Sequence, residues 1–174
     1  MTESLTVGDT ARMGRLVTER DIELFSEITG DRNPLHFDAD LATRSRFGGI
    51  IVQGGITSGL LNAVVAEKLP GPGSVFLHVD WSFRAAVHPG DEITAEVEVL
   101  EVRTDKPITR LRTVVTNQDG TVVLEGTALV PGPGCLVEVE NASDWQPWRS
   151  GSTPDELGVS DPLSQRVAEV EHLV

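Results

Sequence analysis

A change of hydrophobic period near residue 74 constrains the fold of this chain more than any other feature. Before it, residues 54–69 carry apolar side chains at helical spacing, at Ile56, Leu60, Leu61, Val64 and Val65. After it, apolar residues recur at every second position, which is the period of half-buried strands. One long helix followed by several antiparallel strands is typical of an α+β fold, in which a curved sheet wraps around a central helix.

The alternation also predicts the buried face of each strand. In the first two runs, the positions expected on this face are Val75, Leu77, Val79 and Trp81, then Ile93, Ala95, Val97 and Val99. Two more strands are expected over residues 108–116 and 121–130. The sequence Asn117-Gln118-Asp119-Gly120 between them is a hairpin signal.

Local signals predict further elements upstream. A short edge strand is expected within residues 7–17. Thr18 and Asp21 form a capping signal for a helix that Gly30 ends. The apolar positions of that helix are Ile22, Phe25 and Ile28. Asp38 can cap a second, shorter helix.

Between these helices, the chain must break twice within a few residues. Gly30 can adopt positive φ, and Asn33 precedes a proline, which disfavours its α conformation. Asp31 and His36 stand on either side of this break, where a carboxylate and an imidazole could face one small pocket. On the residues alone, a capping aspartate and a solvated histidine explain the pattern equally well.

A second unusual feature is the start of the central helix, where Gln53 precedes Gly54 and Gly55. The glycines leave the first backbone N–H groups uncovered, so a ligand oxygen could approach them. Close packing of the helix against its surroundings also requires glycine, and the residues alone favour this packing role.

Composition limits the other possibilities. The 174 residues, 39% of them hydrophobic, suffice for one domain over residues 1–134. Residues 135–174, rich in proline, serine and acidic residues, are expected to form a partly flexible extension with a short helix near residues 162–173. Its Trp145 and Trp148 could pack on the domain or on a partner.

The formal charge of -13 argues against binding to nucleic acid or to an anionic membrane. The single cysteine, Cys135, excludes an intrachain disulfide, and the sequence has neither a secretory start nor an apolar run that could span a bilayer. We therefore expect a soluble cytoplasmic protein. No residues have metal-ligand spacing, so we expect no metal and no bound cofactor.

The run from Phe25 to His36, followed by Ala42, resembles the signature of the MaoC-like (R)-specific enoyl-CoA hydratases, the hydratase 2 group. Looser similarity extends from about residue 5 to residue 131 and includes residues 47–49, 54–55, 69–73 and 89–91. The resemblance implies the hot-dog fold and a homodimer. Two positions depart from the pattern. Gln53 replaces the histidine of many relatives, which bears on the organisation of the helix start, and Asn62 replaces a small hydroxyl residue, which bears on acyl-chain length.

The resemblance also implies a reaction, the addition of water across a trans-2-enoyl thioester to give an (R)-3-hydroxyacyl thioester, or its reverse. Asp31 would be the base that activates water, and His36 would hold the water and exchange the proton. The implied substrate-binding residues are Asn33, Gln53, Gly54 and Gly55. The substrate would be an acyl-CoA thioester, or one carried on acyl-carrier protein. Its anionic part needs local positive charge, for which the candidates are Arg12, Arg15, Arg84, Arg110 and Arg112.

Two alternatives stay open. A hot-dog thioesterase usually places an acid on or near the central helix, and the only carboxylate there is Glu67, near its end. A catalytically silent subunit that binds acyl thioesters is the other alternative, against which the intact Asp31 and His36 argue. His78 and His88 compete weakly with His36, because neither has a carboxylate at motif spacing.

Overall fold

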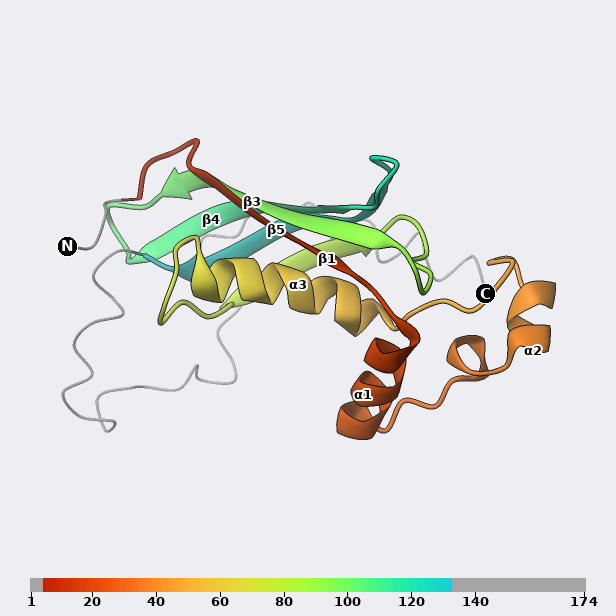
Figure 1. The fold of residues 1–174 in the computed structure, drawn as a ribbon. Coiled ribbons are helices and arrows are strands. Elements are labelled where there is room, and N and C mark those ends of the chain that lie inside the picture. The colour runs from red at the N-terminus through yellow and green to blue at the C-terminus, as the bar shows by residue number, and fades with distance from the viewer. Residues whose placement is uncertain (1–4, 133–174) are drawn as a thin grey trace, which may run out of the picture. The chain divides into compact units, whose positions relative to one another are not determined.

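A computed structural model describes residues 5–132, which form an antiparallel sheet packed on one central helix (Figure 1). The strands are β1 (Thr10–Leu16), β2 (His78–Phe83), β3 (Glu92–Val102), β4 (Ile108–Thr116) and β5 (Val122–Pro131). Their order in the sheet is β1-β3-β4-β5-β2, so β1 and β2 form the two edges. Every neighbouring pair is antiparallel. The predicted α+β hot-dog architecture is confirmed.

The helices are α1 (Glu19–Thr29), α2 (Ala39–Arg44) and α3 (Gly54–Glu67), with a 3₁₀ turn η1 (Pro34–His36). α3 is the central helix and packs on β1, β3 and β4. The shorter elements gather near its N-terminal end (Figure 1). No helix within residues 5–132 combines the length and the apolar composition needed to cross a membrane. The expected extension, residues 135–174 with its helix and two tryptophans, lies outside the described residues.

The core lies between α3 and the sheet, as the two hydrophobic periods predict. The buried aliphatic side chains of α3 are Leu60, Leu61, Val64 and Val65. Those of β3 are Ile93, Ala95, Val97 and Val99. Burying one aliphatic side chain of this size contributes about 1.5–3 kcal/mol, so this layer is the main source of stability.

Helix α1 begins and ends at the residues that the capping signals predict. The carboxylate of Asp21 accepts hydrogen bonds from the backbone N–H and the hydroxyl of Thr18, at 2.7 and 2.8 Å. Partial burial raises the pKa of Asp21, but these bonds and the charge of Arg15 outweigh it, so the pKa lies below its usual value. Gly30 ends the helix with φ of 79°. Ile28, an expected apolar position, is 83% exposed and lines an open groove beside α3 instead of packing in the core.

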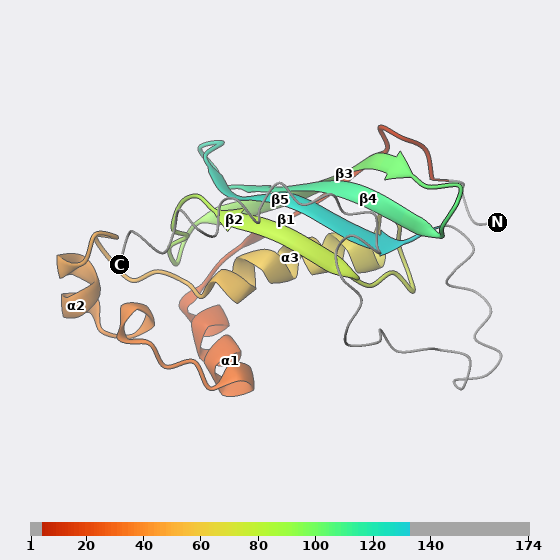
Figure 2. The same cartoon turned by 180° about the vertical axis from the view of Figure 1, so that it is seen from behind.

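The edge strand β2 departs from the expected burial. Val75, Leu77 and Val79, predicted to be buried, are 54%, 40% and 39% exposed. Val79 pairs with Ala128 of β5 at the sheet edge, beyond the strands on which α3 packs (Figure 2). Of the four predicted positions, Trp81 is the one that is half-buried, and its ring meets Phe76 edge to face at 5.3 Å. The apolar alternation on β2 therefore continues onto a surface that α3 leaves open.

Gly126 of β5 offers a test of how β2 is held. An added Cβ there would lie 1.9 Å from the carbonyl oxygen of Asp80, so Gly126→Ala must push the two strands apart. We expect a loss of about 1–3 kcal/mol in the free energy of unfolding, measured in urea. Gly59→Ala is the control, because no atom lies within 4 Å of its Cβ and alanine favours a helix by about 1 kcal/mol. Equal stability of the two variants would contradict this account.

Candidate active site

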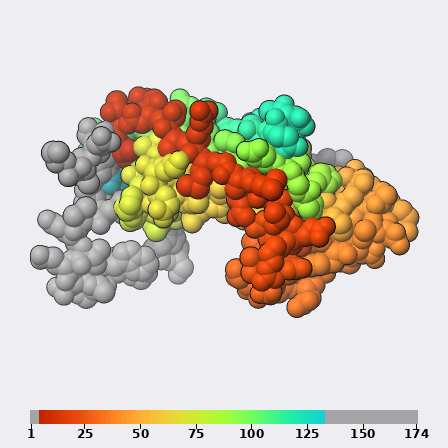
Figure 3. Space-filling model, viewed as in Figure 1, coloured from red at the N-terminus to blue at the C-terminus, as the bar shows by residue number. Residues whose placement is uncertain are grey.

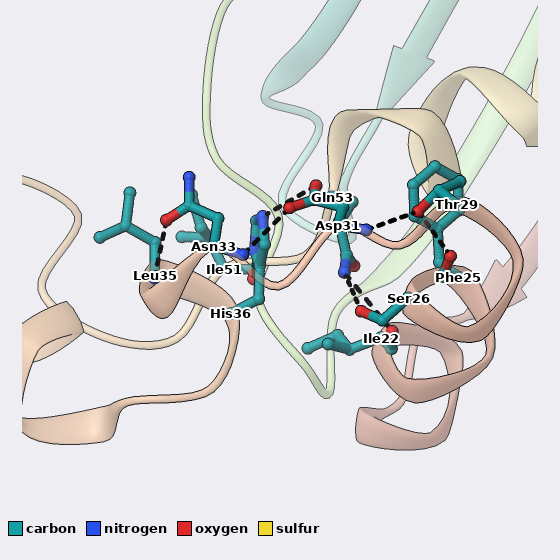
Figure 4. A network of polar contacts seen from close by, with 10 residues as sticks. All are labelled: Ile22, Phe25, Ser26, Thr29, Asp31, Asn33, Leu35, His36, Ile51 and Gln53. Carbon is teal, nitrogen blue, oxygen red and sulfur yellow. Dashed lines mark hydrogen bonds and ion pairs between the residues drawn. The ribbon is translucent and has the colours of Figure 1, made fainter.

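The break between α1 and α2 is held by hydrogen bonds within the loop. The side chain of Asn33 accepts from the backbone N–H of Leu35 at 3.1 Å, which caps η1. The backbone N–H of Asn33 donates to the carboxylate of Asp31 at 3.0 Å. Asn33 thus fixes the loop that carries the two candidate catalytic residues (Figure 4). Its expected contact with substrate stays a prediction.

Asp31 and His36 lie together, as the sequence predicts. Asp31 Oδ2 is 3.7 Å from His36 Nε2, which is longer than a hydrogen bond but close enough for one water to contact both atoms. The histidine side chain is 8% exposed and the aspartate side chain 40%. One partner of the pair is therefore buried, and the other can be reached from solvent.

The tautomer of His36 follows from its other nitrogen. Nδ1 lies 2.7 Å from the carbonyl oxygen of Ile51, which can only accept, so Nδ1 carries the proton. In the neutral ring, Nε2 then has a free lone pair that faces Asp31. Both atoms of the pair can accept a hydrogen bond from the same water (Figure 4).

The segment that leads into α3, residues 50–52, forms hydrogen bonds with chain segments on both of its sides. Toward the loop, the N–H of Ile51 donates to the carbonyl of Leu35 at 3.3 Å. Toward the sheet, the N–H of Val52 donates to the carbonyl of Val87 at 2.8 Å. His88 Nδ1 lies 2.7 Å from the carbonyl oxygen of Ile50. Two histidines thus bind consecutive carbonyls, and His88 is a supporting residue that the sequence pattern did not reveal.

Gln53 is buried at the start of α3, with 2% of its surface exposed. Its Nε2 donates to Ser26 Oγ at 3.0 Å and to the carbonyl of Ile22 at 3.4 Å, both on α1. Its Oε1 is buried and has no hydrogen-bond partner within residues 5–132. The side chain therefore joins α1 to α3, and its expected role in substrate binding stays a prediction.

The two glycines after Gln53 face different neighbours. An added Cβ at Gly55 would lie 2.2 Å from the ring of Phe25 on α1, so this glycine is required for packing. At Gly54 the nearest atom would be 2.9 Å away, in the ring of Phe83, which is 57% exposed. Neither glycine has positive φ, so their backbone is unstrained. Of the two, Gly54 is the one accessible to a ligand.

Two hollows meet at this helix start. The first, which we call the arginine cleft, has a volume of about 260 Å³ and is lined by Arg46, Arg84, Phe47, Phe83, Ile51 and Gly54, among others. The second, the apolar groove, has a volume of about 410 Å³ and lies between α1 and α3, where Gly55 and Leu60 line it. In Figure 3, atoms of α1 border α3, whose outer side stays visible. Asp31 and His36 line neither hollow, but Ile51 joins His36 to the arginine cleft.

The charged and metal-ligating side chains of the described residues bear on two kinds of site, a metal site and an anion site. Within residues 5–132, no three His, Cys, Asp or Glu side chains converge in a way that could hold a metal ion. Of the expected arginines, Arg84 lines the arginine cleft, whereas Arg12 lies on β1, at the opposite edge of the sheet from β2. Arg46, which lines the same cleft as Arg84, was not among the residues expected to bind an anion.

Comparison with known proteins relates this geometry to a family. Residues 6–121 match the MaoC like domain. The (R)-specific enoyl-CoA hydratase of Aeromonas caviae is 38% identical over 131 residues, which are 75% of this chain and 98% of the relative. The 3-hydroxybutyryl-CoA dehydratase of Methylorubrum extorquens is 41% identical over 131 residues, covering 75% and 83%.

The solved structures that resemble this chain include hydratases, as do the relatives found by sequence. The (R)-hydratase of A. caviae has a TM-score of 0.72 at 38% identity, covering 75% of this chain and 99% of that one. The unliganded R-hydratase PhaJ1 of Pseudomonas aeruginosa has a TM-score of 0.69 at 39% identity, covering 74% and 83%. The loop that carries Asp31 lies within residues 6–121, which match the family.

The packing role of Gly55 can be tested by a compensating pair. Gly55→Ala places a methyl group against the ring of Phe25, so we expect a loss of about 1–3 kcal/mol in the free energy of unfolding. Adding Phe25→Leu should recover part of this loss, measured against the Phe25→Leu variant alone. If Gly55→Ala lowers turnover without lowering stability, the glycine serves ligand approach and the packing account is wrong.

Proposed function

Because the chain belongs to the MaoC-like domain family, we propose that it adds water to a trans-2-enoyl thioester, giving the (R)-3-hydroxyacyl thioester, and catalyses the reverse dehydration. Its relatives carry the names hydratase and dehydratase, and the chain is a hydro-lyase. The proposed substrate is an acyl-CoA thioester or the corresponding acyl-carrier-protein thioester, since relatives of both names match.

The observation that supports this proposal is the geometry of Asp31 and His36. One water would donate its two O–H groups to Asp31 Oδ2 and His36 Nε2, which are 3.7 Å apart. Asp31 takes a proton as the water oxygen forms a bond to the β-carbon of the substrate. That proton is then delivered to the α-carbon by way of the pair, so the elements of water add across the double bond.

The helix start would stabilise the negative charge that forms on the thioester oxygen between these steps. The first N–H groups of α3 have no partner within the helix and lie at the positive end of its dipole. Gly54 is exposed there, so an oxygen can approach without a Cβ in the way. This arrangement is electrostatic stabilisation of the oxyanion-hole type, in which one donor is worth about 10²–10³ in turnover.

The alternative of a thioesterase fits the structure less well. Glu67 is exposed and is the last residue of α3, so it lies about 20 Å from Gly54 along a helix that rises 1.5 Å per residue. A silent binding subunit does not explain why His36 has a fixed tautomer beside a carboxylate. The paired acid and base favour the hydratase.

We also propose that the protein is a homodimer. The segment of residues 75–83, which contains β2, carries exposed apolar side chains at Val75, Leu77, Val79 and Phe83, which are 39–57% exposed. β2 is also an edge of the sheet, so the backbone groups on its outer side have no strand partner within residues 5–132. Exposed apolar side chains and an open sheet edge both favour association with another chain. A second copy of β2 in antiparallel pairing would cover the side chains and satisfy the backbone together.

Replacing Asp31 tests the chemistry directly. Asp31→Asn keeps the size of the side chain but removes the base, so we expect turnover of crotonyl-CoA to fall by at least about 10²-fold. Loss of the enoyl-thioester absorbance measures this rate, and thermal melting checks the fold. Asp119→Asn, in the β4–β5 hairpin, is the matched control and should be fully active. A combined Asp31→Asn and His36→Ala variant should lose little more than the first, because both residues act on one water.

The dimer proposal has its own test. Val79→Lys places a charge in the proposed interface, so we expect a monomer by sedimentation velocity where the unchanged chain is a dimer. Val7→Lys is the control, since Val7 is 62% exposed and precedes β1. A monomeric unchanged chain, or a Val79→Lys variant that still dimerises, would refute this arrangement.

A further inference from the structure

Arg46 differs from five other arginines of the described chain in that no carboxylate within residues 5–132 pairs with it. Several arginines pair with a carboxylate, in Arg15–Asp21, Arg20–Glu23, Arg84–Glu125, Arg103–Asp105 and Arg112–Glu98. Arg46 forms no ion pair with any carboxylate of residues 5–132, and its guanidinium lies 4.9 Å from the centre of the Phe47 ring. This cation is exposed and available to an external anion.

The arginine cleft combines this cation with an apolar floor. Arg46 and Arg84 are exposed at its rim, where Arg84 keeps one contact to Glu125 at 2.8 Å. Val52 and Val87, at its floor, are 5% and 4% exposed. None of the described side chains that line the cleft is acidic, although the chain carries a formal charge of -13. The cleft therefore suits a ligand with a largely uncharged body and an anionic end.

We propose that the arginine cleft binds the phosphopantetheine arm of the substrate, with Arg46 and Arg84 on its phosphate. This inference rests on the proposed function. Gly54 lines the same cleft, so a thioester oxygen at the helix start places the arm within it. Arginine binds phosphate through two parallel hydrogen bonds, which suits the end of the arm.

The apolar groove on the other side of the helix start is the less suitable place for this arm. Its lining is mostly apolar, and its cation, Arg15, is already paired with Asp21. The two glycines thus line different hollows: Gly54 lines the arginine cleft, and Gly55 lines the apolar groove. Coenzyme A and acyl-carrier protein share the phosphopantetheine group, so the cleft would serve either carrier.

The test compares crotonyl thioesters that differ only in the carrier. For Arg46→Gln we expect KM to rise about tenfold with crotonyl-CoA and with crotonyl-4′-phosphopantetheine, because a charged hydrogen bond is lost, while kcat changes less than about twofold. With crotonyl-pantetheine, which has no phosphate, KM should equal that of the unchanged chain. Arg12→Gln removes the same charge on β1 and should leave every KM unchanged.

The outcomes separate this inference from the proposed function. An equal rise in KM with crotonyl-pantetheine, or no rise with any thioester, overturns the phosphate contact. A rise with crotonyl-CoA alone overturns it too, because the arginine would then contact the nucleotide. A rise that extends to a crotonyl acyl-carrier protein supports the shared phosphate. If the unchanged chain hydrates none of these thioesters, the proposed function fails. Calorimetry then still tests the cleft, by comparing the affinity of the Arg46→Gln and Arg12→Gln variants for 4′-phosphopantetheine.

Discussion

The hydrogen bond between His36 Nδ1 and the carbonyl of Ile51 is the interaction on which the site depends. It fixes the tautomer that leaves Nε2 free toward Asp31, and it fixes the ring in a buried position. The carbonyl belongs to the segment that leads into α3, so the same bond couples the loop that carries Asp31 and His36 to the helix start. His88 binds the preceding carbonyl from the turn before β3, which holds this segment from the sheet side. The proposed acid–base pair and the proposed oxyanion site therefore share one support, and a shift of residues 50–52 would move both.

Features that depend on neighbours in sequence could be predicted. The helical stripe of α3, the alternation of β3 and the Asp119-Gly120 hairpin are local patterns, and the structure contains each of them. The burial of Val75, Leu77 and Val79 was predicted wrongly, because alternation identifies a face of a strand but neither where the strand begins nor what covers it. β2 begins only at His78, and in the segment before it Phe76, rather than Val75 or Leu77, packs against the core. Val79 lies on the edge strand, and α3 packs on other strands.

The residues of the candidate site also fall into two groups, those that a local sequence pattern predicts and those that depend on distant parts of the chain. Asp31 and His36 stand five residues apart at a backbone break, a pattern visible in the sequence, and the structure brings them together. His88 and Arg46 have no such signal, because His88 acts on a carbonyl 38 residues away and Arg46 lines a cleft formed by distant segments. The expected role of Gln53 in substrate binding stays a prediction, whereas the contact of its amide nitrogen with α1 had no sequence signal. The direction of a side chain before a helix depends on tertiary packing, which a sequence pattern does not report.

An acidic protein that binds an anionic substrate needs its positive charge at the point of contact. At physiological ionic strength, charges separated by more than about 8 Å in solvent are largely screened, so most of the surface carboxylates have little effect on a phosphate in the arginine cleft. An arginine that already holds a carboxylate must give up that contact to bind a phosphate. Arg46 has no such contact within the described residues, and Arg84 has one. The larger share of the proposed phosphate binding therefore falls to Arg46, which no sequence pattern identifies.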